Sequence, residues 1–247
     1  KYEENYRITA EALEAAVSDK TKLLIINYPN NPTGQILTKA DIQALTVFLR
    51  KHPDIYVLSD EIYEKIVYDQ KQIISLASIP EFFDRVVIVN GFSKCSAMTG
   101  WRLGYLACNT AMYQVVLKLF QHSISCTSGF LQRGALTAMD CVEETEQMRQ
   151  AYEKRKNLLV KGIHEIPGVE LLTPAGAFYA WVKFDTDMDS ETLCNDLLDK
   201  AKIAGVPGIA YGEEDCVCIR FSFAASEDVL RTMLERLKTY QTTHNDL

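Results

Sequence analysis

A lysine followed closely by an arginine is the feature of this sequence best suited to chemistry. Lys94 ends the segment Gly-Phe-Ser-Lys, which follows a β-branched run, and Arg102 comes eight residues later. A lysine that lies beside a cation and is partly removed from water loses proton affinity, so its amine becomes a usable nucleophile. The pair predicts amine chemistry at this point of the chain, and the alternative is a solvated loop lysine.

Other common catalytic patterns are missing from the 247 residues. The sequence has no Gly-x-Gly-x-x-Gly, Walker A, Gly-x-Ser-x-Gly or His-Glu-x-x-His pattern, which disfavours dinucleotide-binding, P-loop, hydrolase and zinc-protease functions. Its seven scattered cysteines indicate reduced thiols. Cys216 and Cys218 form the only close pair, but no histidine lies nearby, so we expect them to pack in a core and predict no metal site.

The overall charge narrows the possible partners. The chain has 33 acidic and 26 basic residues and a net charge of −7, which disfavours nucleic acid and anionic membranes as partners. No apolar run approaches the roughly 20 residues that span a bilayer, and the polar first residues do not resemble a signal peptide. We therefore expect a cytoplasmic globular protein.

Three apolar runs in the first half of the chain are predicted to be strands, at residues 23–27, 55–59 and 86–89. Short apolar runs of this kind are typical of a parallel sheet that is covered on both faces, so an α/β fold is predicted. In such sheets ligands gather beyond the carboxyl ends of the strands. The residues found there are Asn31, Asp60 and Lys94.

A helix is predicted between the first two of these strands. Thr38 and Asp41 form a Thr-x-x-Asp variant of the capping box, and apolar residues then recur at helical spacing. His52 and Pro53 end the pattern.

The second half of the chain predicts a smaller α+β unit. A long charged helix at residues 139–166 would link it to the first unit, and strands are expected at 169–172, 177–183 and 217–223. Helices are expected at 190–204 and from Ser226. Along the last predicted strand, Arg220 alternates with apolar residues. Its side chain is therefore expected on the face opposite the apolar one.

Four motifs give the sequence a resemblance to a known family. They are Asn31-Pro-Thr-Gly34, Asp60-Glu-Ile-Tyr63, Ser93-Lys94 with Met98-Thr-Gly-Trp-Arg102, and Arg220-Phe-Ser-Phe-Ala224. In this order and at these spacings the chain resembles the class I/II aminotransferases, which depend on pyridoxal phosphate and have fold type I. The resemblance covers essentially the whole chain and implies transamination between an amino acid and a 2-oxo acid.

The resemblance implies a role for each matching residue around the cofactor ring. Lys94 would hold the cofactor as an internal aldimine and then move the proton between the substrate Cα and the cofactor C4′ carbon. Asp60 would face the pyridine nitrogen, although Asp60 or Glu61 could instead cap a following helix. Asn31 and Tyr63 would bind the phenolate oxygen; the alternatives are a turn-forming asparagine and an ordinary half-buried tyrosine.

The resemblance also implies residues for the two anions of the reaction. Arg102 would bind the cofactor phosphate, with a possible contribution from Ser93. Where many relatives carry a phosphate-contacting serine, three residues before the lysine, this chain has Gly91. Arg220 would clamp the substrate α-carboxylate, and the alternative is a surface salt bridge. Five aromatic residues, Trp101, Tyr105, Phe178, Tyr179 and Trp181, are expected to be core and packing residues.

The position of the motifs leads to an expectation about the whole protein. They lie closer to residue 1 than in complete family members, so we expect this chain to lack the N-terminal part. The expected domains are 1–138, a partial large cofactor-binding domain; 139–166, an inter-domain helix; and 167–247, a small C-terminal domain. The motifs favour an aspartate-like or broad-specificity aminotransferase that is a homodimer when complete. A non-catalytic remnant or interaction module, and a lyase or synthase that uses the same cofactor, remain alternatives.

Overall fold

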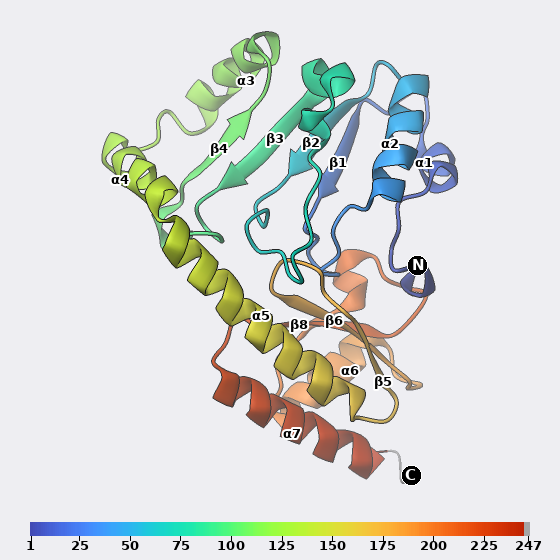
Figure 1. The fold of residues 1–247 in the computed structure, drawn as a ribbon. Coiled ribbons are helices and arrows are strands. Elements are labelled where there is room, and N and C mark those ends of the chain that lie inside the picture. The colour runs from blue at the N-terminus through green and yellow to red at the C-terminus, as the bar shows by residue number, and fades with distance from the viewer. Residues whose placement is uncertain (245–247) are drawn as a thin grey trace. The chain divides into compact units, whose positions relative to one another are not determined.

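The computed structural model describes residues 1–244, which form two compact units (Figure 1). The parallel-sheet unit contains residues 7–29 and 36–148. The antiparallel-sheet unit contains residues 1–6 and 30–35 and the chain from Arg149 onward. None of the helices within residues 1–244 is long and apolar enough to cross a membrane.

The parallel-sheet unit is built on four strands in the order β1-β2-β3-β4. The first three are parallel, and β4 runs antiparallel to β3. Residues of β1, β2 and β3 pack with α2 in a core that includes Ile26, Leu45, Phe48 and Val57. The elements are α1 (Ala10–Ala16), β1 (Leu23–Asn27), α2 (Lys39–Lys51), β2 (Tyr56–Asp60), β3 (Val86–Gly91), β4 (Gly104–Ala107), α3 (Thr110–Ser123) and α4 (Gly129–Asp140).

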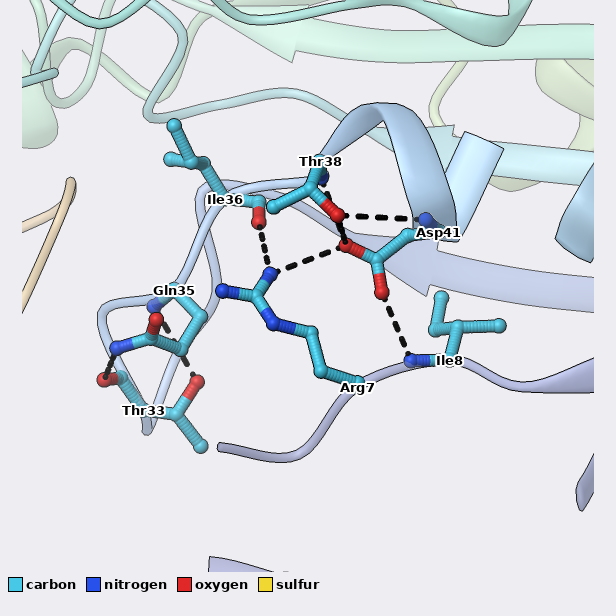
Figure 2. Close-up of polar contacts among 7 residues, drawn as sticks. All are labelled: Arg7, Ile8, Thr33, Gln35, Ile36, Thr38 and Asp41. Atoms are coloured by element: carbon cyan, nitrogen blue, oxygen red, sulfur yellow. Dashed lines mark hydrogen bonds and ion pairs between the residues drawn. The ribbon is translucent and has the colours of Figure 1, made fainter. Parts of the chain in front are cut away.

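The predicted capping box is confirmed at the start of α2. Thr38 Oγ1 accepts the backbone N–H of Asp41, and the Asp41 carboxylate accepts the backbone N–H of Thr38 at 2.7 Å. The carboxylate also accepts hydrogen bonds from Arg7 Nη1 and from the backbone N–H of Ile8, each at 3.0 Å (Figure 2). Burial alone would raise the pKa of Asp41, but the hydrogen bonds from Thr38 and Ile8 and the charge of Arg7 hold it below its usual value. Asp41 therefore ties residues 7 and 8 to α2.

The expectation of a sheet covered on both faces is wrong for β1 in this chain. Leu23 and Ile25 are 48% and 64% exposed, whereas the alternating residue Ile26 is buried. Trp101 and Tyr105 are not core residues as expected, because these rings are 39% and 47% exposed, but each is a packing residue: Tyr105 lies against Phe92 and Trp101 lies against Gly134. Apolar spacing predicts which face of a strand is apolar, but the covering of that face depends on other segments.

The antiparallel-sheet unit has the strand order β5-β6-β8-β7, and each neighbouring pair is antiparallel. Trp181 on β6 lies opposite Arg220 on β8. Cys218 is fully buried and packs with Leu172 and Trp181, so its predicted packing role is confirmed. The elements are α5 (Val142–His164), whose residues up to Met148 belong to the parallel-sheet unit, β5 (Val169–Leu172), β6 (Tyr179–Phe184), α6 (Ser190–Asp196), β7 (Val206–Pro207), β8 (Cys218–Ser222) and α7 (Glu227–His244).

Two predicted helices have different bounds in the structure. The helix expected at 139–166 spans Val142–His164, because Cys141 adopts a non-helical backbone conformation and separates it from α4. The helix expected at 190–204 ends at Asp196 and continues as a π-helical turn, Leu197–Ala201, until Lys202 adopts a left-handed conformation. The short 3₁₀ turns are Tyr2–Glu4, Leu76–Ser78, Pro80–Arg85, Thr99–Trp101 and Gly208–Tyr211.

Candidate active site

Lys94 lies in a compact turn directly after β3. The backbone N–H groups of Ser96 and Met98 both donate to the carbonyl of Phe92, which folds the chain around Lys94. The Lys94 ammonium nitrogen lies 5.9 Å from the centroid of the Tyr63 ring, and Tyr63 is only 4% exposed. The structure therefore places a half-buried lysine beside a buried phenol.

Asp60 is the last residue of β2, and its backbone is paired with both neighbouring strands. Its carboxylate accepts the backbone N–H of Ile62 at 3.1 Å, within a turn that does not become a helix. Glu61 is buried and accepts the hydroxyls of Ser59 at 2.9 Å and Ser75 at 2.6 Å. The helix-capping alternative for Asp60 and Glu61 is therefore wrong, and Asp60 and Lys94 occupy the carboxyl ends of neighbouring strands.

Arg102 and Ser93 are connected through Thr99. The Thr99 hydroxyl donates to the Ser93 carbonyl at 2.8 Å, and the Thr99 carbonyl accepts Arg102 Nη1 at 3.2 Å. Arg102 is exposed and has a left-handed backbone, with φ at 51°. Sequence reasoning missed Thr99 as a residue of this turn, although it lies inside the motif that contains Arg102.

Gly91 lies where β3 and β4 approach each other most closely. It is paired with Gly104, and a Cβ built on Gly91 would lie 2.9 Å from both the Gly104 Cα and the Leu103 carbonyl oxygen. Because both neighbours are backbone atoms, a side chain would force the two strands apart. Close packing against β4 therefore leaves no room for a side chain at this position.

Asn31 belongs to the antiparallel-sheet unit, within the turn of residues 30–35. Asn30 Oδ1 accepts the backbone N–H and the hydroxyl of Thr33, at 3.0 and 2.7 Å. Gly34 has a φ of +69°, and its Cβ would lie 2.5 Å from Pro174 Cβ, so only glycine fits. The Gln35 amide donates to the carbonyls of Thr33 and Thr173 at 3.4 and 3.0 Å, and Figure 2 shows the first of these bonds.

Arg220 is held from three directions within the same unit. Its Nη1 donates to Asn31 Oδ1 at 2.8 Å. Its guanidinium carbon lies 4.4 Å from the centroid of the Tyr179 ring and 5.3 Å from that of Tyr211. Within residues 1–244, Arg220 Nε is buried and has no hydrogen-bond partner. A surface salt bridge, the alternative for this arginine, does not occur among the described residues.

The sequence predicts only part of the role of Tyr179 and none for Tyr211, although both rings contact Arg220. Tyr179 is 8% exposed and so packs in the core as expected, but its ring also lies against Arg220. Tyr211 was not singled out, because a tyrosine in a Gly-rich turn carries no sequence signal for an arginine partner nine residues later.

The predicted site residues thus form two groups, each described within its own unit. Asp60, Tyr63, Ser93, Lys94 and Arg102 lie in the parallel-sheet unit, and Asn31 and Arg220 lie in the antiparallel-sheet unit. The first group supplies an amine, a carboxylate, a phenol and a guanidinium; the second supplies a guanidinium edge suited to a carboxylate. Among the residues that the structure covers, no group of three or more His, Cys, Asp or Glu side chains is arranged to hold a metal ion.

The chain is similar to known aminotransferases along almost all of its length. The family model described as aminotransferase class I and II matches residues 1–237. An aspartate aminotransferase of Musicola paradisiaca is 40% identical over 238 residues, which are 95% of this chain and 59% of the relative. An aromatic-amino-acid aminotransferase of Thermococcus litoralis is 38% identical over 242 residues, 96% of this chain and 62% of the relative.

Solved structures give the same result. The aromatic aminotransferase of Pyrococcus horikoshii superimposes with a TM-score of 0.95 at 35% identity, covering 100% of this chain and 67% of that protein. The aspartate aminotransferase of Rhizobium meliloti has a TM-score of 0.91 at 31% identity, with 97% and 62% covered. The chain spans about three fifths of the length of the curated relatives it matches. Sequence, fold and motifs together place the chain in the class I and II aminotransferase family.

Proposed function

We propose that this chain carries the catalytic lysine and the substrate-carboxylate arginine of an aminotransferase that transfers an amino group between an amino acid and a 2-oxo acid. The observation that carries the proposal is the position of Lys94, with its amine 5.9 Å from the buried Tyr63 ring and Asp60 at the end of the neighbouring strand. A solvated loop lysine would not need a buried phenol beside it.

Class I and II aminotransferases use pyridoxal phosphate. When bound, this cofactor supplies an electron-withdrawing ring that takes up the electron pair left when a proton leaves the amino acid Cα. Lys94 would hold the cofactor through its amine and then carry that proton between Cα and C4′. Asp60 would accept the pyridine N–H, and this contact favours the protonated ring. Tyr63 would donate its hydroxyl to the phenolate oxygen.

The phosphate of the cofactor fits the turn that follows Lys94. Arg102 supplies a planar guanidinium with several N–H donors, which suits phosphate oxygens. Ser93 would add its hydroxyl, and its backbone is fixed by the hydrogen bond from Thr99. Gly91 has no side chain and no space for one, and its backbone N–H already donates to Asn90 Oδ1 at 2.7 Å, so Gly91 would not bind the phosphate.

The substrate carboxylate fits Arg220. Its unpartnered, buried Nε and its planar fork suit a carboxylate, and Asn31 already holds Nη1 at 2.8 Å. Asn31 would also bind the phenolate oxygen of the cofactor. Relatives named as aspartate and as aromatic-amino-acid aminotransferases lie at similar identity, which supports an aspartate-like or broad specificity.

From its family membership we also propose the domain organisation, location and oligomeric state of the whole protein. Residues 1–138 would belong to the large cofactor-binding domain, 139–166 to the inter-domain helix and 167–247 to the small domain. The protein would act as a cytoplasmic homodimer, and amino acids and 2-oxo acids would be its partners. The oligomeric state is measured directly by light scattering.

The cofactor assignment is tested by titration with pyridoxal phosphate, followed by borohydride reduction and mass mapping of the modified lysine. The protein at its natural length and the 247-residue chain are compared with Lys94→Ala. Lys65→Ala is the matched control, because Lys65 is 60% exposed and its ion pair in the described part of the chain is with the neighbouring Glu64 at 3.6 Å. Transamination is then assayed with aspartate and with phenylalanine as amino donors and 2-oxoglutarate as acceptor.

We expect the label on Lys94, and turnover that Lys94→Ala abolishes and Lys65→Ala leaves intact. A label spread over many lysines, together with no turnover for any amino donor at natural length, would contradict the proposal. If the 247-residue chain binds pyridoxal phosphate but transaminates no substrate, whereas the protein at natural length does, this part of the protein binds the cofactor without completing the reaction.

A further inference from the structure

Arg220 meets two tyrosine rings, and one of them lies at the surface. Tyr179 is 8% exposed and forms the buried side of the contact, whereas Tyr211 is 37% exposed. We propose that Tyr211 is a positioning residue for carboxylate recognition, because its ring lies against the Arg220 guanidinium and limits the orientations in which that group can meet a ligand. This inference rests on the proposed function of Arg220.

The backbone of Tyr211 is fixed next to the strand that carries Arg220. Tyr211 ends the 3₁₀ turn Gly208–Tyr211, which Gly212 closes with a φ of +78° and an N–H donated to Ile209 at 3.0 Å. A Cβ built on Gly208 would lie 2.9 Å from the Cys218 carbonyl oxygen, so the turn lies directly against β8. The place of the ring is therefore set by close backbone packing.

The ring of Tyr211 is supported on a second side by Trp181. The two rings meet edge to face, with centroids 5.7 Å apart and planes at 84°. Trp181 is 1% exposed, and its indole N–H donates to the Tyr6 hydroxyl at 2.8 Å. The Tyr6 hydroxyl in turn donates to Glu213. This chain of contacts fixes the indole, and the fixed indole limits how far Tyr211 can turn.

The contact with Arg220 depends on the ring of Tyr211 rather than on its hydroxyl. The hydroxyl makes no hydrogen bond within residues 1–244, while the ring faces both Trp181 and Arg220. Burial raises the pKa of Tyr211, partly opposed by the charge of Arg220, so the ring stays neutral and keeps its attraction for the cation. Phenylalanine at this position would therefore keep the contact, and leucine would remove it.

Loss of the Tyr211 ring leaves Arg220, among the described residues, with the Tyr179 ring and the hydrogen bond to Asn31. The guanidinium then gains rotational freedom and is more hydrated in the free protein. From the range of cation–π energies, this weakens carboxylate binding roughly two- to thirty-fold. Because the loss acts on ligand capture, it raises KM and leaves kcat nearly unchanged.

The experiment uses the cofactor-loaded protein at natural length and four variants, Tyr211→Phe, Tyr211→Leu, Arg220→Lys and Tyr2→Leu. Tyr2→Leu is the matched control, because Tyr2 packs on the same aromatic cluster through Tyr6 but does not touch Arg220. The dissociation constant of maleate, an unreactive dicarboxylate, is measured by calorimetry. KM and kcat are measured for both substrates, and the cofactor absorbance band and Tm are recorded for every variant.

We expect Tyr211→Phe and Tyr2→Leu to bind maleate within twofold of the wild type, and Tyr211→Leu to bind it roughly two- to thirty-fold more weakly with a matching rise in both KM values. Wild-type maleate affinity in Tyr211→Leu, with weak binding in Arg220→Lys, would overturn this inference and leave the proposed function standing. Wild-type affinity in Arg220→Lys would overturn the carboxylate role of Arg220 itself. If Tyr211→Leu lowers Tm strongly, Tyr211→Met, which keeps a long apolar side chain against Trp181, replaces it in the same comparison.

Discussion

Replacing Gly91 by serine tests whether the close approach of β3 and β4 excludes a side chain at this position. The new Cβ would lie 2.9 Å from two backbone atoms, the Gly104 Cα and the Leu103 carbonyl oxygen. Overpacking of this kind costs about 1–3 kcal/mol. Loss of glycine freedom in the unfolded chain offsets about 0.4–1 kcal/mol of this. We therefore expect Gly91→Ser to lower the free energy of unfolding by about 1–2 kcal/mol and Tm by about 2–8 °C.

The assay is thermal unfolding without cofactor, combined with an absorbance titration for the pyridoxal phosphate dissociation constant. Gly91→Ala separates the effect of the Cβ from that of the hydroxyl and should destabilise to a similar extent. Gly100→Ser is the matched control, because a Cβ on Gly100 would meet no heavy atom within 4 Å. We expect no tighter cofactor binding in Gly91→Ser, since its hydroxyl enters only after the strands separate. An unchanged Tm together with tighter binding would refute the reasoning.

Two further perturbations test local structure at the start of α2 and in the turn of residues 30–35. Asp41→Asn removes the charge that pairs with Arg7 at 3.0 Å and should lower stability by about 1–2 kcal/mol near neutral pH. Because the pKa of Asp41 is lowered in the folded protein, this contribution is present above about pH 4 and is lost as pH falls through the lowered value, so the stabilities of wild type and variant should converge in acid. Urea unfolding from pH 3 to 7 checks this, and a constant difference would contradict it. Gly34→Ala combines a φ of +69° with a 2.5 Å clash against Pro174, whereas Gly212→Ala has a φ of +78° in open space. Gly34→Ala should therefore be the more destabilising of the two in urea, and equal losses would show that the clash relaxes.

The sequence predicts local structure well where the determinants are close together in the chain. The strand at residues 23–27 and the capping box of Thr38 and Asp41 are confirmed with their predicted residues, because apolar runs and cap spacing are local signals. Strand β2 begins and ends one residue later than expected. Helices α3 and α4 were not predicted. Among their residues only Ala135 is buried, so contacts within residues 1–244 require little of the apolar spacing from which a helix is predicted.

The partners of the site residues could not be predicted in the same way. Asn31 and Arg220 are 189 residues apart, and nothing in either motif specifies a hydrogen bond between them. The same holds for Tyr211, whose distance to Arg220 depends on how a 3₁₀ turn packs on β8. The family resemblance indicated which residues matter, whereas only the structure indicates what holds them.

The energetics of Arg220 explain why its support is built from several different contacts. A buried donor without a partner costs about 1–3 kcal/mol, and Arg220 Nε is such a donor within residues 1–244. Asn31 Oδ1 accepts Nη1, and the rings of Tyr179 and Tyr211 contact the guanidinium, while Nε stays without a partner among these residues. A carboxylate of this chain paired with Arg220 would neutralise its charge. Under the proposed function, holding the cation with an amide oxygen and two neutral rings instead leaves that charge available, and a substrate carboxylate would meet a guanidinium that is already oriented.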